Sequence, residues 1–506
     1  MPEPWELGAE EIARRVAARE LSAAEVVGSA LDRTGRVEPL VAAYLAVYDE
    51  EARAAAAELD RRLAAGEPAG RLAGVPVALK DNLSLAGKPL TCGSKILAGY
   101  VAPYTATAVE RLLAEGAVVL GRANMDEFAM GSSTENSAYA KTRNPWHLAR
   151  VPGGSSGGPA AAVAAGSAAL GFGSDTGGSV RQPAALCGVV GVKPTWGRVS
   201  RYGLVAFASS TDQIGPVARD VRDAALALSV IAGPDPRDST CAARPAEDYL
   251  AGIEEGVRGL RVGILREVDA GGLAAAARRN WRDSLALLAR AGAEPVEVSV
   301  PSLGAAIAVY YVIATSEASA NLARFDGVRY GRRAAEAENL LDLYLRSRSE
   351  GFGAEVKRRI MLGTFALSSG YYEAYYGRAR GVLEGMRRQV EAAFAAVDLL
   401  VTPTAPSGAF ALGEKVDDPL AMYLSDIFTT PASLLGLPAV AVPSGADDEG
   451  LPLSLQIMGR PFDEATVFRA ARAFEREAGW RVAPGFRGAE PAPNRALAGP
   501  AGAPAG

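Results

Sequence analysis

The chain has 506 residues, of which 49% are hydrophobic and 22% are charged, so it is long enough for one large core or two to three ordinary domains. Its formal net charge is -5, which argues against a surface that grips the phosphate backbone of a nucleic acid by itself. These values favour a soluble globular protein that handles any nucleic acid together with a partner.

The cysteines and the apolar runs indicate in which cellular compartment the protein works. Cys92, Cys187 and Cys241 form no Cys-x-x-Cys pair, so we expect neither a disulfide framework nor a thiolate metal site. The first residues, MPEPWELGAEE, are acidic where a signal peptide is basic and then apolar, and the most apolar long run, 159–173, is alanine and glycine. We therefore expect a cytoplasmic protein without a membrane span.

The first part of the chain, residues 1–69, has helical patterns. Residues 10–37 and 50–65 are rich in alanine and arginine with amphipathic spacing, and Ser22 interrupts the first of them as a plausible N-cap. We expect these N-terminal helices to pack on the core.

From residue 70 onward, short β-branched runs alternate with glycine-rich turns and helical patterns. The expected strands lie within 73–79, 116–122, 189–194, 259–265, 295–300, 397–406, 436–445 and 452–459, and helices are expected at 108–115, 281–291 and 464–478. Strands with crossover helices predict an α/β fold. The glycine, proline and alanine of 485–506 predict a disordered tail.

Two glycine-rich loops carry serines, VPGGSSGGPAAAVAAG at 151–166 and GSDTGGSVRQPA at 173–184. The first lacks the lysine of a phosphate-binding Walker loop. It contains Gly-x-Ser-x-Gly, but the nucleophile elbow of α/β-hydrolases needs a later histidine, and the only histidine is His147. Tight turns between strand and helix are the alternative for both loops.

If a serine here is a nucleophile, its base must be something other than imidazole. A desolvated lysine can lose most of its affinity for a proton, whereas arginine stays charged and an ordinary carboxylate is a poor base for a hydroxyl. Lys80 and Lys193 both lie in apolar segments, LAGVPVALKDN and VVGVKPT. A snorkelling or salt-bridged side chain is the alternative for either lysine.

Three motifs, LKDN at 79–82, GGSSGG at 153–158 and DTGGSVRQPA at 175–184, resemble the amidase signature family. The resemblance runs from about Gly70 to Gly479. It implies a single large domain, 70–484, with a central mixed β-sheet covered by helices on both faces, and a Ser-Ser-Lys triad that uses no histidine.

Carried over to this sequence, the resemblance implies that Ser179 is the acyl-forming nucleophile, Ser155 the relay and Lys80 the base, so that Lys193 has no catalytic role. It also implies a cis peptide bond between Gly154 and Ser155. The backbone amides of Thr176, Gly177, Gly178 and Ser179 would form the oxyanion hole.

Several further stretches, among them MDEFAMGSSTENSAY and MYLSDIFTTPASLLGLPAVAVP, are similar to one branch of that family, the glutaminase subunits of aspartyl/glutamyl-tRNA amidotransferases. The branch implies glutamine as substrate, with Arg359 and Asp426 as its charged anchors and Tyr310 beside them. Arg358 is an alternative to Arg359.

The same branch implies an assembly. A partner B subunit would activate the carboxylate of a misacylated tRNA with ATP and Mg²⁺, and a small C subunit would wrap the pair. No cofactor and no metal is expected in this chain. The alternatives are a stand-alone amidase acting on small amides, which has the same triad, and a non-catalytic module whose glycine loops hold an anion.

Overall fold

The computed structural model describes residues 2–270 and 272–488, in which eleven strands form one mixed sheet in the order β1-β3-β2-β4-β6-β5-β10-β11-β9-β7-β8. The strands are β1 (Tyr44–Val47), β2 (Pro76–Lys80), β3 (Val118–Ala123), β4 (Leu170–Asp175), β5 (Val190–Lys193), β6 (Gln213–Ala218), β7 (Arg261–Leu265), β8 (Glu294–Val298), β9 (Leu399–Pro403), β10 (Ala439–Ala446) and β11 (Pro452–Met458).

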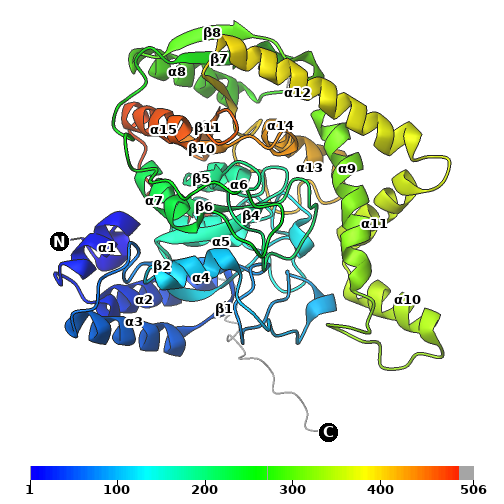
Figure 1. Cartoon of the computed structure of the whole chain (residues 1–506), viewed down its shortest axis with the longest axis horizontal. Helices are drawn as coiled ribbons and strands as arrows, with labels where there is room; N and C mark the ends of the chain where they lie inside the picture. The colour runs from blue at the N-terminus through cyan, green and yellow to red at the C-terminus, as the bar shows by residue number, and fades with distance from the viewer. Residues whose placement is uncertain (1, 271, 489–506) are drawn as a thin grey trace.

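Helices cover this sheet (Figure 1). They are α1 (Ala9–Ala17), α2 (Ala23–Val41), α3 (Asp49–Ala64), α4 (Thr107–Ala114), α5 (Gly157–Ala165), α6 (Arg181–Cys187), α7 (Val221–Ile231), α8 (Ala275–Arg290), α9 (Ala306–Asn321), α10 (Leu340–Gly351), α11 (Ala354–Leu367), α12 (Arg378–Ala396), α13 (Pro419–Tyr423), α14 (Thr430–Leu434) and α15 (Glu464–Ala478). The predicted α/β class with a single large sheet is confirmed.

The sheet is parallel at two places and antiparallel elsewhere. β2 is parallel to both β3 and β4, and β7 is parallel to both β8 and β9. The central strands β4, β6, β5, β10, β11 and β9 pair antiparallel in that order. The carboxyl ends of β2 and β4 therefore meet at one edge, which is where open α/β sheets place their ligand sites.

The N-terminal segment joins the same sheet. Ser22 caps α2 as predicted, because its hydroxyl accepts from the Glu25 amide at 3.1 Å while the Glu25 carboxylate accepts from the Ser22 amide at 2.7 Å. The segment also contains β1, which was not predicted and pairs antiparallel with β3 at the sheet edge. The domain boundary at residues 69 and 70 stays a prediction.

Strands β4 and β6 were also missed by the sequence analysis. β4 has the sequence LGFGSD, whose glycines have low intrinsic strand propensity. The fold needs them, because a Cβ on Gly171 would lie 2.9 Å from the Pro159 carbonyl oxygen and a Cβ on Gly173 would lie 2.5 Å from the Ser156 hydroxyl. Close packing of α5 on β4 therefore decides this strand.

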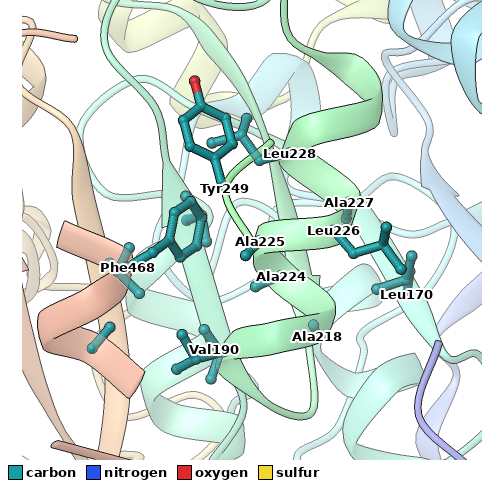
Figure 2. Packing of buried hydrophobic residues seen from close by; sticks show 14 of the residues in the cluster. Leu170, Val190, Ala218, Ala224, Ala225, Leu226, Ala227, Leu228, Tyr249 and Phe468 are labelled. Carbon is teal, nitrogen blue, oxygen red and sulfur yellow. The ribbon is translucent and has the colours of Figure 1, made fainter. Parts of the chain in front are cut away.

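The main core lies between the sheet and the helices that cover it, and Figure 2 shows the part at α7. α7 presents the small side chains Ala224 and Ala225 and the larger Leu228 there, and Phe468 of α15 packs beside them against Tyr249, with ring centroids 5.6 Å apart. The small side chains let α7 lie close to the strands. The rings of Tyr249 and Phe468 fill the space beside it.

A second core lies under the arm formed by α9, α11 and α12, at the right of Figure 1. The stretch Pro301–Arg324, which contains α9, is long and apolar enough to cross a membrane by length and composition. It packs against α11 so closely that a Cβ on Gly363 would lie 1.9 Å from the Thr315 carbonyl oxygen. This packing accounts for its apolar composition, and the cytoplasmic location stays a prediction.

The predicted tail 485–506 falls mostly outside the described residues. Of it, residues 485–488 are described, and they pair with the segment 145–148: the Phe486 amide donates to the Pro145 carbonyl at 2.9 Å and the Leu148 amide donates to the Arg487 carbonyl at 2.7 Å. Residues 489–506 lie outside the described part of the chain.

The packing shown in Figure 2 predicts how much the loss of one buried ring destabilises the protein. Phe468 is fully buried, so Phe468→Ala should lower the free energy of unfolding by about 3 to 5 kcal/mol, the usual cost of such a cavity. Phe365→Ala is the matched control, since that ring is 46% exposed and its loss should cost less than about 1 kcal/mol. Chemical denaturation of both variants measures the difference, and equal costs would contradict the prediction.

Candidate active site

The site lies where β2, β4 and the amino ends of α5 and α6 meet. Lys80 is the last residue of β2, and Asp175 is the last residue of β4. The serine loop 153–156 leads into α5, and the loop 176–180 leads into α6. The neighbouring parallel strands thus bring the two predicted serine loops and Lys80 together.

Lys80 is fully buried, and its amine is hydrogen-bonded to hydroxyl and carbonyl oxygens. Its Nζ donates to the hydroxyls of Ser155 at 2.7 Å, Ser156 at 2.8 Å and Ser174 at 3.1 Å, and it lies 3.2 Å from the Ser174 carbonyl oxygen. Burial lowers the pKa of Lys80 to about 7, although the negative charges of Asp126 and Asp175 work in the opposite direction. The amine can therefore be neutral near neutral pH.

The two serine loops are joined through their backbones. The Gly154–Ser155 peptide bond is cis, as predicted. The Ser156 amide donates to the Ser179 carbonyl oxygen at 3.0 Å, while the Ser155 carbonyl oxygen accepts from the Asp126 amide at 3.2 Å. Within residues 2–270 and 272–488 no hydrogen bond joins the Ser155 and Ser179 hydroxyls, and Ser179 is 7% exposed.

The loop around Ser179 is fixed from the side of α14. Thr429 and Thr430 both donate hydroxyl hydrogen bonds to the Gly177 carbonyl, at 2.8 and 3.2 Å. Gly178 has φ +140°, and a Cβ there would lie 2.1 Å from the Thr429 hydroxyl oxygen, so only glycine fits. In the described chain the amides of Gly177, Gly178 and Ser179 donate to no protein acceptor, which suits the predicted oxyanion hole.

A fully buried ion pair lies behind this loop. Arg181 donates to both carboxylate oxygens of Asp175, at 2.9 and 2.8 Å, and also to the Thr429 carbonyl, the Gln456 side chain and the Ser433 hydroxyl. Burial disfavours a charged Asp175, but the guanidinium outweighs burial and keeps the pKa of that carboxyl below its usual value. This complete network anchors the beginning of α6.

The second candidate lysine lies elsewhere in the sheet. Lys193 is the last residue of β5, and its Nζ donates to the Pro194 carbonyl at 2.9 Å. Burial and the charge of Arg181 lower the pKa of Lys193 to about 7 as well. The two lysines thus differ in their neighbours rather than in their pKa, because only Lys80 contacts the serines.

The structure distinguishes between the two candidate arginines of α11. The Arg359 side chain is 3% exposed, pairs with Glu355 at 2.7 Å and lies 5.0 and 5.4 Å from the ring centroids of Tyr311 and Tyr423. The Arg358 side chain is 44% exposed and pairs with the same glutamate from outside. Arg359 therefore faces the interior beside the site, and Arg358 faces solvent.

Tyr310 and Asp426 lie beside the loop 176–179. A Cβ on Gly177 would lie 2.7 Å from Cζ of Tyr310, so the tyrosine ring lies directly on the loop. Asp426 accepts from the Ser132 hydroxyl at 2.5 Å through Oδ2, whereas its buried Oδ1 has no partner among the described residues. Burial raises the pKa of Asp426 to about 7, so a cationic ligand group there would favour the ionised form.

Several residues that hold the site were not singled out from the sequence. Asp126 accepts backbone hydrogen bonds from Ser133, Thr134 and Asn136, and Gln182 bridges the Gly154 amide and the Ser132 carbonyl. Their side chains bind backbone groups of distant loops, which no local pattern reveals. Ser156 and Ser174, the other hydroxyls on Lys80, lay inside the two glycine-rich loops already noted.

The described residues contain no group of three or more histidine, cysteine, aspartate or glutamate side chains placed to hold a metal ion.

The family model described as Amidase matches residues 25–468. The chain belongs to the amidase family. The match begins inside α2, earlier than the start near Gly70 that the motifs indicated.

Similar proteins in other organisms cover nearly the whole chain. The chain is 57% identical over 479 residues to the A subunit of the glutamyl-tRNA(Gln) amidotransferase of Anaeromyxobacter sp. strain K, covering 94% of this chain and 97% of the relative. It is 55% identical over 473 residues to the protein of the same name from Carboxydothermus hydrogenoformans, with the same coverage.

Solved structures agree with the fold. The crystal structure of the A subunit of the glutamyl-tRNA(Gln) amidotransferase from Thermotoga maritima is 43% identical, with a TM-score of 0.78 over 94% of this chain and 96% of that one. The peptide amidase of Stenotrophomonas maltophilia is 33% identical, with a TM-score of 0.81 over 96% of this chain and 100% of that one. The predicted family and its large mixed-sheet domain are confirmed.

The buried ion pair gives the second prediction. Asp175→Asn should cost about 3 to 5 kcal/mol of unfolding free energy, because it leaves the buried Arg181 without its counter-charge. Glu11→Gln removes a surface carboxylate that pairs with Arg14, whose side chain is 53% exposed, and with Arg15, and it should change stability by less than about 1 kcal/mol. Denaturant unfolding of both variants compares the pairs, and a stable Asp175→Asn protein would contradict this interpretation.

Proposed function

We propose that the chain is the glutaminase subunit of a tRNA-dependent amidotransferase, hydrolysing glutamine through an acyl-enzyme and passing the ammonia to a partner. The contact of a buried, readily neutral Lys80 with Ser155 carries the proposal, since it supplies a base for serine chemistry without histidine. The amidotransferase subunits at 55 and 57% identity support the choice of substrate.

Ser179 attacks the side-chain amide carbon of glutamine and passes its proton to Ser155, which passes its own to the neutral amine of Lys80. The negative charge that develops on the amide oxygen is stabilised by the N–H groups of the loop 176–179. Lys80 returns the proton through the same hydroxyl to the departing nitrogen, which leaves as ammonia. Water then attacks the glutamyl ester, and the same relay takes its proton, releasing glutamate.

Glutamine is recognised by two opposite charges. Arg359 binds its α-carboxylate and Asp426 binds its α-ammonium group through the unpartnered Oδ1. Tyr310 packs beside the reacting amide, against Gly177. The burial of Arg359, compared with the exposed Arg358, favours Arg359 in this role.

The ammonia is consumed by a partner B subunit that activates the carboxylate of Glu-tRNA(Gln) or Asp-tRNA(Asn) with ATP and Mg²⁺, and a small C subunit wraps the pair. The chain itself takes no cofactor in this proposal. The outer surface of α11 and of the turn that follows it supports a protein partner, because it exposes large apolar side chains that a monomer rarely shows together. We call this surface, formed by Met361, Leu362, Phe365, Tyr371 and Tyr375, the α11 patch.

A stand-alone amidase acting on small amides would use the same triad, and the peptide amidase is a structural relative. The higher identity to the amidotransferase subunits does not favour that alternative. The relatives' names mention Glu-tRNA(Gln) only, so amidation of Asp-tRNA(Asn) rests on the resemblance alone.

Removing the nucleophile separates the two half-reactions. Ser179→Ala should abolish glutamine hydrolysis, yet the assembled complex should still amidate misacylated tRNA with free ammonium, because the partner's site is untouched. Intact mass spectrometry of the wild type after rapid quench should show a glutamyl adduct, absent from the variant. Parallel loss of the ammonium-driven reaction would contradict the proposal.

The two buried lysines can be distinguished by their variants. Lys80→Arg should lower glutaminase kcat/KM by about 10²- to 10⁴-fold, because a guanidinium has no lone pair for base work. Lys193→Met should retain activity. In the wild type kcat/KM should rise with pH through about 7, since Lys80 is protonated and unable to accept a proton below that value. A rise that disappears in Lys193→Met would assign the base to Lys193 instead.

If the α11 patch is the interface with the partner subunits, charged substitutions there should weaken their binding. The double variant Met361→Glu with Phe365→Glu should weaken binding to the B and C subunits by about 100-fold or more, since it places charges in an apolar interface. Leu113→Glu on α4 is the matched control, because that leucine is 42% exposed but stands outside the patch. Sedimentation of the purified complex measures assembly, and glutaminase activity of the free variant should persist.

A further inference from the structure

A cavity of about 410 Å³ lies between the end of the sheet, α12 and the segment 427–437, and the proposed reaction does not use it. Its walls are almost entirely apolar, with contributions from Leu265, Val268, Val390, Leu400, Leu437 and Met458. Pockets for small molecules have volumes of about 300 to 1,000 Å³ and such linings. An apolar cavity of this size binds apolar molecules more readily than water.

One side of the cavity carries a carboxylate with an unused acceptor. Oε1 of Glu267 accepts from the Ser299 hydroxyl at 2.6 Å and from the Val300 amide at 2.9 Å, so the side chain is held in place. Its buried Oε2 has no hydrogen-bond partner in the described part of the chain. A buried acceptor without a donor is costly, and a donor supplied by a ligand would remove that cost.

The far wall of the cavity is the back of the substrate-binding segment. Ile427, Phe428 and Pro431 line the cavity. Between them in the sequence, Thr429 and Thr430 bond to the carbonyl of Gly177 in the nucleophile loop, and Asp426 comes directly before. A molecule that fills the cavity therefore presses on the same segment that carries the glutamine anchor.

A chain of hydrogen bonds also connects the cavity with the nucleophile loop. Thr402 lines the cavity, and its hydroxyl accepts from Nε2 of Gln456 at 2.9 Å. Oε1 of Gln456 accepts from Arg181 at 2.5 Å, and Arg181 holds Asp175 at the base of the loop 176–179. The same Nε2 donates to the Phe428 carbonyl at 2.8 Å, so Gln456 ties both connections together.

We propose that this cavity is a regulatory site for a small primary amine with an apolar body, whose ammonium group pairs with Glu267 and whose body packs on Phe428 and Leu400. An occupied cavity holds the segment 426–431 in its binding conformation, so the amine tightens the binding of glutamine. The effect on glutamine goes beyond the proposed glutaminase reaction, whereas the binding of the amine is independent of it.

Calorimetry with 4-phenylbutylamine tests the site in the full chain, with 4-phenylbutyrate as the probe of opposite charge. The amine should bind saturably and at least about tenfold more tightly than the carboxylate. Glu267→Gln should weaken the amine about tenfold and remove this preference. In the glutaminase assay a saturating amine should lower the KM for glutamine about fivefold.

Gly304→Phe blocks the cavity at its rim, where an added Cβ meets no atom within 4 Å, so the variant should fold and lose amine binding. Gly381→Phe on α12 is the matched control, since its Cβ position is equally open and outside the cavity. Absence of saturable amine binding, equal binding by both phenylalanine variants, or an unchanged KM would each overturn the proposal. Calorimetry still reports amine binding if the chain hydrolyses no glutamine, so the two proposals fail separately.

Discussion

The burial of the Lys80 amine is the constraint on which the rest of the site depends. An ammonium group taken out of water is costly, and the three serine hydroxyls around Lys80 can serve the neutral amine as well as the charged one. The acids that oppose this effect are themselves tied to backbone amides. Asp126 accepts from the loop 133–136, and Asp212 accepts from Phe207 and Ala208, so the groups that tune Lys80 also hold its surroundings.

Glycines allow these surroundings to come close enough. A Cβ on Gly154 would lie 2.1 Å from Oδ2 of Asp126, and one on Gly178 would lie equally close to the Thr429 hydroxyl. At both glycines the space that a Cβ would need is taken by polar atoms of other segments. Glycine is therefore needed in the two serine loops because several loops pack closely around one buried amine, in addition to any close approach of a substrate.

The segment 426–431 contacts the loop 176–179 on one side and the apolar cavity on the other. Its threonines bond to the Gly177 carbonyl in the loop 176–179, while Phe428 and Pro431 face the apolar cavity. Arg181 fixes the position of the segment, because the guanidinium bonds to the Thr429 carbonyl as well as to Asp175. Movement of this segment would therefore break bonds to a buried charge. Gln456 of β11, a buried polar side chain, joins these groups, because it bonds to the Phe428 carbonyl and accepts from Arg181.

Patterns in the sequence predicted the α/β class, eight of the eleven described strands and the helices α1 to α4, α8 and α15, but not the long helices α7 and α9 to α12. The candidate site residues came from the resemblance to the amidase signature family. Apolar runs placed β2 and β11, Ser22 as an N-cap placed the start of α2, and the scarcity of histidine directed attention to two lysines in apolar segments, Lys80 and Lys193. These features are local, because a run, a cap or a motif is complete within a few residues. By residue pattern Lys80 and Lys193 are equivalent, since both lie at the ends of apolar strands, and only the family resemblance favoured Lys80. The tertiary structure shows that Lys80 contacts Ser155 whereas Lys193 does not, and that Arg359 is buried whereas Arg358 is exposed. Such contacts depend on which distant segments meet, so no local pattern contains them. The same reason applies to β1, β4 and β6, whose strand structure comes from neighbours across the sheet and from the packing of α5 rather than from their own residues.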